Sequence, residues 1–249
     1  MNTTIETILR HRSIRKFKDK ALTDEQIETI VRSAQAASTS SYIQAYTIIG
    51  VDDLDIKARL AELAGNQSYV AENGHFFVFC ADLHRHEVIS ELHSQDFSES
   101  LESTEKYMVA VIDAALAAQT ASIAAESMGL GICYIGGIRN QLDKVSELLN
   151  TPDRVIPLFG LAVGYPDQEP YLKPRLPLEN VYHKNGYQQN DQLYKKQLEE
   201  YDQEISAYYH ERTGGKRKET WTGQMAKMLS LPKRMYMKDF VEKKGFNKR

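Results

Sequence analysis

The sequence lacks the features that define several protein classes. It contains only two cysteines, Cys80 and Cys133, each in an apolar stretch, and no C-x-x-C motif. A disulfide framework is therefore not expected. Both thiols are predicted to be buried inside the protein, and the protein is predicted to reside in a reducing compartment. No apolar run approaches the roughly 18 residues of a membrane span, and no basic-then-apolar leader opens the chain. We expect a cytoplasmic protein without a membrane partner.

A strong excess of charge of either sign is also missing. The 31 Lys and Arg residues face 34 Asp and Glu residues, which leaves a net charge of -3. Nucleic acid is therefore not an expected partner, and any basic cluster must act locally. The common glycine-rich phosphate motifs, G-x-G-x-x-G and G-x-x-x-x-G-K-[ST], do not occur. This argues against a Rossmann dehydrogenase or a P-loop enzyme, so side chains must hold any bound phosphate.

The segment His11–Arg15, with the sequence HRSIR, carries the groups that such a site needs. It places two guanidiniums, an imidazole and a hydroxyl close together, just past a short amphipathic helix. Arginine presents a planar, always-charged fork, and the other two groups add hydrogen bonds. A second basic pair, Lys173 and Arg175, lies far down the chain, and the two segments form one anion pocket if they meet. The alternative is a solvated basic helix end, since a helix C-terminus favours cations.

The apolar pattern predicts helices and strands in a mixed order. Capping boxes at Thr3–Glu6 and Thr23–Gln26 predict the starts of two helices. Strands are predicted at 47–51, 76–81, 132–135 and 158–163, further helices at 56–64, 105–128 and 142–149, and a polar, irregular segment at 84–103. The alanine-rich 105–128 helix is interpreted as the central core helix, close to a subunit interface. Few β-α-β units occur, so the pattern indicates an α+β fold.

The character of the chain changes after Pro177. Residues 179–249 are polar, rich in tyrosine and helical in pattern, with few long apolar runs. We expect a core at 1–178 and a helical C-terminal extension at 179–249 that packs on a dimer, because such a segment cannot build a core of its own.

Five short motifs carry a resemblance to a known family. In chain order they are HRSIRKF at 11–17, STSSYIQ at 38–44, GNQ at 65–67, YIGGIR at 134–139 and KPRLP at 173–177. Each motif alone is weak, but the five in this order resemble the oxygen-insensitive NADPH nitroreductase and NADPH–FMN oxidoreductase group of the FMN-dependent nitroreductase family. The resemblance runs from about Ile5 through the 212–221 segment. It implies a mostly antiparallel central sheet flanked by helices, in a homodimer with two cofactor sites at the subunit interface.

The resemblance also implies bound FMN. The residues implied to contact it are His11, Arg12, Ser13, Ile14, Arg15, Thr39, Ser41, Gln67, Tyr134, Ile135, Gly136, Gly137, Lys173 and Arg175. The residue types suit this ligand, since cations match a terminal phosphate and glycines admit a flat ring close to the main chain. One departure is Thr39, which stands where the group commonly has serine and adds a methyl. The alternatives are a plain turn at 136–137 and a capping loop at 38–41.

A final basic cluster at 212–218 surrounds the pair Gly214–Gly215. By the resemblance, Arg212 and Arg217 hold the 2′-phosphate of NADPH, whereas composition alone favours a solvated run of charge. The implied reaction is ping-pong hydride transfer from NADPH to flavin N5 and on to nitroaromatics, quinones or free flavin. No side chain is expected to act as catalytic acid or base, because the flavin carries the hydride.

Three other functions remain as alternatives. A flavin reductase that supplies reduced FMN to a partner and an FMN-binding protein without turnover share the same site residues. A metal hydrolase built on His84 and His86 needs both imidazoles to converge, and residues two apart do not share a helical face. We expect no metal site and interpret that segment as an exposed loop.

Overall fold

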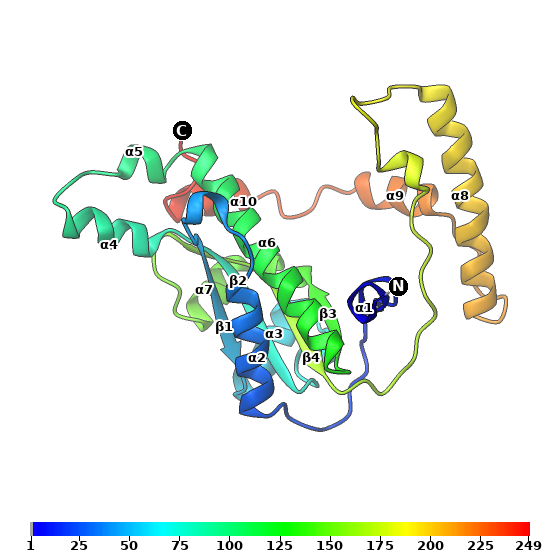
Figure 1. The fold of residues 1–249 in the computed structure, drawn as a ribbon, viewed down its shortest axis with the longest axis horizontal. Coiled ribbons are helices and arrows are strands. Elements are labelled where there is room, and N and C mark those ends of the chain that lie inside the picture. Colours follow the sequence, from blue (N-terminus) through cyan, green and yellow to red (C-terminus); the bar gives the residue numbers. More distant parts are fainter. Residues whose placement is uncertain (1) are drawn as a thin grey trace. The chain divides into compact units, whose positions relative to one another are not determined.

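The computed structural model describes residues 2–249, which divide into two compact units. The first unit comprises the residues up to Pro170 together with Arg234–Arg249, and the second comprises Tyr171–Lys233. The helices of the first unit are α1 (Thr3–Leu9), α2 (Asp24–Gln35), α3 (Leu54–Leu63), α4 (His84–Leu92), α5 (Ser98–Leu101), α6 (Thr104–Ser127), α7 (Leu142–Leu148) and α10 (Met237–Lys243), and its strands are β1 (Tyr46–Val51), β2 (His75–Asp82), β3 (Gly131–Ile135) and β4 (Val155–Gly164) (Figure 1).

The four strands form one sheet in the order β1-β2-β4-β3, and every neighbouring pair is antiparallel. This confirms the predicted α+β architecture with a mostly antiparallel sheet. The side chains of β2 alternate between the two faces, as a strand buried on both sides requires. Phe77 and Phe79 join the cluster on the face covered by α2 and α6, whereas Phe76 and Val78 join the cluster on the opposite face, with residues of α3 and α7.

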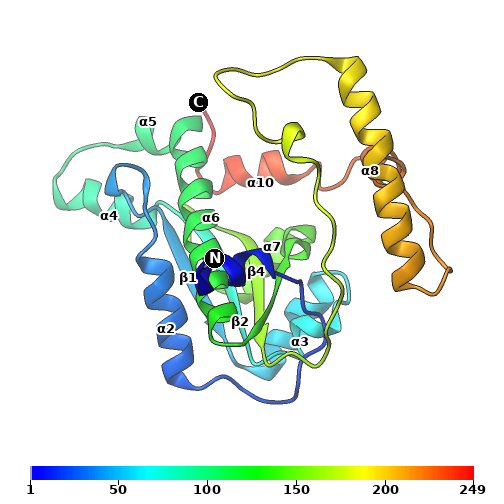
Figure 2. The same ribbon diagram turned by 45° about the vertical axis from the view of Figure 1, so that its right-hand side comes forward.

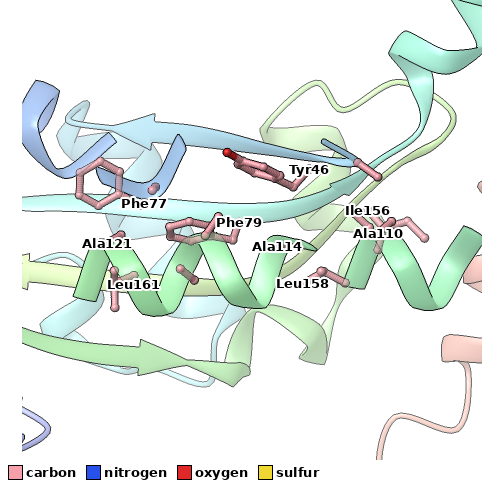
Figure 3. Packing of buried hydrophobic residues seen from close by; sticks show 14 of the residues in the cluster. Tyr46, Phe77, Phe79, Ala110, Ala114, Ala121, Ile156, Leu158 and Leu161 are labelled. Carbon is pink, nitrogen blue, oxygen red and sulfur yellow. The ribbon is translucent and has the colours of Figure 1, made fainter. Parts of the chain in front are cut away.

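Helix α6 is the central helix of the first unit and runs beside α2 (Figure 2). Ala110, Ala114, Ala117 and Ala121 are fully buried. Their methyl groups let the helix lie close to the phenylalanines of β2 and to Leu161 of β4 (Figure 3). Among residues 2–249, α6 is the one helix long and apolar enough to cross a membrane, but half of that stretch is buried inside the first unit, as in a core helix.

The structure corrects the interpretation of residues 84–103 as irregular. They contain α4 and α5, and α4 begins where the Asp82 carboxylate accepts the His84 N–H at 2.9 Å. The helix is stabilised by distant partners, since Arg85 and His86 donate to main-chain carbonyls of the 43–46 segment. Tertiary contacts therefore compensate for a polar sequence with no regular apolar face.

The predicted helix starts meet different outcomes. The Thr23–Gln26 capping box is confirmed, with both reciprocal hydrogen bonds present. The predicted box at Thr3–Glu6 is wrong by one position, because Asn2 is the N-cap and its side chain accepts the Ile5 N–H at 3.0 Å. Asparagine caps as well as threonine does, so either residue satisfies the first turn.

The last residues of the chain, which end the predicted 179–249 extension, pack in the first unit. Phe246 is fully buried and meets the Tyr107 ring edge-on at 5.8 Å, and Phe240 and Val241 of α10 join the same core cluster. The second unit contains α8 (Asp191–Arg212) and α9 (Trp221–Leu229), and it buries a small aromatic cluster around Tyr201 and Tyr209. A few well-placed apolar side chains are therefore enough to fix segments that read as polar.

A buried histidine gives the first unit a predictable pH dependence. His75 is 6% exposed and packs on Phe77, and burial lowers the pKa of its imidazole. The unfolded chain gains a proton below about pH 6.5, its ordinary pKa, while the folded chain does not. Stability is therefore present above that pH and falls by up to about 1.4 kcal/mol per pH unit as the solution is acidified.

Urea unfolding between pH 7.5 and 5 measures this loss. The His75→Gln variant is expected to show a flatter pH profile than the parent, whereas His93→Gln, at an exposed position, keeps the parental slope. Equal slopes for the parent and His75→Gln are incompatible with this assignment.

Candidate functional site

The basic segment 11–15 is fixed along one edge of the sheet. The Ile14 N–H donates to the Ile132 carbonyl at 2.8 Å, and Ser13 forms an isolated parallel bridge with the same residue of β3. Ile14 is buried and lies over Gly131, where an added Cβ would come within 2.6 Å of its side chain. Because side chains alternate along an extended segment, Ser13 and Arg15 are directed away from the core.

Two residues of this segment pair with carboxylates. His11 Nδ1 lies 2.7 Å from Glu126 Oε1 at the end of α6, and Arg12 Nη1 donates to Glu169 Oε1 at 2.9 Å. The Glu169 side chain is 85% exposed, so this ion pair contributes little stability. Arg12 Nε is buried and has no hydrogen-bond partner among the described residues. An unpaired buried guanidinium donor is a group that a phosphate oxygen satisfies.

Arg15 and Gln67 are linked through Tyr69. Gln67 Nε2 donates to the Ala64 carbonyl at 2.6 Å, and the Tyr69 hydroxyl donates to Gln67 Oε1. Burial raises the pKa of Tyr69 and the neighbouring Cys133 raises it further, while the adjacent Arg15 side chain opposes both. Tyr69 thus stays a neutral donor that fixes the Gln67 amide beside a guanidinium.

The Gly136–Gly137 turn completes this cluster at the end of β3. A Cβ on Gly137 would lie 2.3 Å from the Ala64 carbonyl oxygen and 2.5 Å from Gln67 Nε2, so only glycine fits here. Tyr134 precedes the turn. Its hydroxyl oxygen accepts a hydrogen bond from the Ser122 hydroxyl of α6, with the two oxygens 2.8 Å apart. Ile135 is buried like Ile14, so these two predicted contacts are available only through the main chain.

The predicted contact residues Thr39 and Ser41 lie in the 38–41 segment, here called the hydroxyl loop, elsewhere in the first unit. The N–H of Ser40, between Thr39 and Ser41, donates to Asp113 of α6 at 3.0 Å, whereas His11 contacts Glu126 of the same helix. The two anchoring positions are separated by roughly 20 Å along α6 at the helical rise of 1.5 Å per residue. The structure therefore brings Arg15, Gln67 and Gly137 together and keeps this loop apart from them.

The remaining predicted residues belong to the second unit. Arg217 lies with its guanidinium carbon 4.4 Å from the centre of the Tyr209 ring, and Lys173 Nζ lies 5.7 Å from the same ring. Arg217 Nε also donates to both Glu219 carboxylate oxygens at 3.1 Å. Arg212 donates to the Tyr208 hydroxyl at 3.3 Å, and Arg175 is exposed. The meeting of Lys173 and Arg175 with segment 11–15 stays a prediction.

Sequence patterns alone did not identify the side chains that anchor the predicted site residues by hydrogen bonds. Glu126, Asp113 and Ser122 each hydrogen bond to a predicted segment. They are among the few polar residues in the central and C-terminal part of an alanine-rich helix, and that position is the sequence signal that could have pointed to them. The two histidines weighed as metal ligands have other contacts: His84 lies 3.9 Å from Glu87, and His86 Nε2 lies 2.9 Å from the Ile43 carbonyl.

Comparison with known proteins places this geometry in a family. The model described as "Nitroreductase family" matches residues 8–165, and "Nitroreductase family, C-terminal domain" matches residues 173–249. A curated relative, FMN reductase (NADPH) of Bacillus subtilis, is 61% identical over 248 residues and covers 100% of both chains.

Solved structures agree with this assignment. NfrA1 of B. megaterium is 68% identical with a TM-score of 0.98, over 99% of this chain and 100% of that one. NADPH:FMN oxidoreductase of Vibrio harveyi, solved in complex with NAD+, is 41% identical with a TM-score of 0.90, over 100% of both chains. With the antiparallel sheet, the ordered motifs and matches over nearly the whole length, the chain belongs to the nitroreductase family.

Proposed function

We propose that this chain is an NADPH-dependent, FMN-containing oxidoreductase that reduces nitroaromatics, quinones or free flavin. Its relatives carry the names FMN reductase (NADPH), NADPH-dependent oxidoreductase and NADPH:FMN oxidoreductase. The observation that carries the proposal is the convergence of Arg15, Gln67 and Gly137 at the end of β3, while Arg12 of the same basic segment has an unpaired guanidinium donor. These are a cation for a phosphate, an amide for a polar ring edge and a main chain open to a flat ligand.

The residues of the chain bind and orient the cofactor. Arg12 and Arg15 would hold the terminal phosphate of FMN, with His11 and Ser13 beside it, and the part that Lys173 and Arg175 play in this contact stays a prediction. The Gln67 amide, held by Tyr69 and Ala64, would keep its remaining N–H directed to the ring. When bound, FMN supplies reversible hydride transfer, which no side chain provides.

We further propose that the active form is a cytoplasmic homodimer. The hydroxyl loop lies too far along α6 to serve the same flavin as its own segment 11–15, so a second copy would supply it. Met108, Ile112 and Leu116 of α6 are about half exposed, at 53%, 46% and 43%, and their spacing of four residues places them on one helical face. An apolar face of this kind suits a symmetric contact with another copy.

A single preparation tests this function. The purified protein is expected to be yellow, to release FMN rather than FAD on denaturation, and to bleach under argon faster with NADPH than with NADH. Sedimentation at micromolar concentration is expected to give twice the 28.4 kDa chain mass. A yellow protein that NADPH leaves unbleached would instead be an FMN-binding protein without turnover, and a monomer with full activity would refute the shared site.

A further inference from the structure

The loop that carries Thr39 and Ser41 has an unfavourable backbone. Ser41, Tyr42 and Gln44 have φ angles of +48°, +57° and +53°, and none of them is glycine. L-residues rarely adopt this left-handed region, and such a conformation persists only where surrounding contacts impose it. Three of these residues within four positions require a strong external constraint.

Asp113 supplies that constraint from α6. Its side chain is 0% exposed, and its two carboxylate oxygens accept main-chain N–H groups from the two ends of the loop. Ser40 N donates to Oδ1 at 3.0 Å, and Ala45 N donates to Oδ2 at 3.0 Å. A buried carboxylate is costly unless it is paired, so these two bonds fix both the acid and the loop.

Helix α4 holds the carbonyl side of the same loop. His86 Nε2 lies 2.9 Å from the Ile43 carbonyl oxygen, and Arg85 donates to the carbonyls of Gln44 and Tyr46. Helix α6 thus binds the N–H groups of the loop, and helix α4 binds its carbonyl groups. The Tyr42 side chain, 82% exposed, is left free at the tip.

We propose that Asp113 is a positioning residue of the flavin site, which it serves by fixing the 40–45 loop that presents Thr39 and Ser41 to the FMN of the partner subunit. The inference rests on the proposed function. Removal of the carboxylate frees two buried N–H groups and lets the three strained residues relax. The hydroxyls of Thr39 and Ser41 then lose their fixed position, while the strand pairing of the sheet is retained.

The first test compares FMN dissociation constants well below the melting temperature. Asp113→Ala is expected to weaken FMN binding about tenfold, and Asp113→Asn, which keeps one acceptor, by less. Ser40→Pro removes one N–H donor without touching the acid, follows an extended Thr39 and should behave like Asp113→Asn. It keeps the proposal testable if Asp113→Ala fails to fold.

The control for a general loss of stability is Val241→Ala. Val241 of α10 is buried like Asp113, but it packs in the core near the C-terminus, far from the loop in sequence. It should lower the melting temperature while leaving FMN affinity as in the parent. Folded Asp113 and Ser40 variants with parental affinity would overturn the proposal. A parent that binds no FMN would instead refute the proposed function.

A mixed dimer tests the action across subunits. An Asp113→Ala chain and an Arg15→Ala chain, carrying different tags, are purified together. If the loop serves the partner's flavin, one site carries both defects and the other carries none, so about half of the parental FMN remains tightly bound. If the loop serves its own subunit, both sites are defective and no tight FMN remains, which would overturn the proposal.

Discussion

Replacement of Arg15 by alanine is expected to weaken FMN binding about tenfold to a hundredfold, which corresponds to about 1.5–3 kcal/mol. The physical reason is the loss of a charge-assisted contact at a position fixed by its neighbours. Main-chain contacts of Ser13 and Ile14 with β3 set the direction of the side chain, and Tyr69 stands beside the guanidinium. The planar guanidinium fork is pre-organised, so less rotamer entropy is lost per hydrogen bond to a phosphate than a flexible ammonium would lose.

Equilibrium dialysis with FMN measures this effect, and Lys16→Ala is the matched control. Lys16 follows Arg15 directly, but its ammonium pairs with Asp167 at 2.7 Å and its side chain is 69% exposed. The control should bind FMN as the parent does, because a screened surface ion pair contributes little. Parental affinity in the Arg15 variant would show that this arginine is not a phosphate ligand.

The fold was largely predictable where the signal is local. A continuous apolar run is sufficient to identify β2, and an alanine-rich period followed by Gly129 is sufficient to identify α6 within one residue of each end. The segment 84–103 was mispredicted because α4 depends on partners in the 43–46 segment, some forty positions away. The sequence likewise does not specify where Phe246 packs, since a lone apolar residue finds its core partners only through the fold.

The site shows the same division between local and distant information. Segment 11–15, Gln67 and the glycine turn are visible as motifs, and the structure places Arg15, Gln67 and Gly137 together. The residues that orient them are separated from them by long stretches of chain: Glu126 lies 115 positions from His11, and Asp113 lies 73 positions from Ser40. No periodicity or spacing specifies such pairs. Polar residues within an alanine-rich apolar helix are the sequence signal that remains.

Substitution of Arg217 is expected to change the choice of nucleotide. NADPH differs from NADH only by its 2′-phosphate, so discrimination must come from cations that meet this group. Arg217 is exposed, and its guanidinium is held in place by the Tyr209 ring on one side and the Glu219 carboxylate on the other. Arg217→Ala should therefore raise KM for NADPH about tenfold and leave KM for NADH nearly unchanged. The loss is one of uniform binding, so kcat at saturation should be kept.

Glu219 provides a variant of opposite sign. Its carboxylate occupies Arg217 Nε and adds a negative charge that repels a phosphate, so Glu219→Gln should lower KM for NADPH and sharpen the preference over NADH. Lys227→Ala, on α9 in the same unit, is the control for a general loss of positive charge and should change neither constant. The preference should fade as salt is raised, because ions in solution screen a solvent-exposed arginine–phosphate contact. If Arg217→Ala raises KM equally for NADPH and NADH, the residue supports the structure of the second unit instead. If neither KM changes, the 212–218 cluster is a solvated run of charge with no role in nucleotide binding.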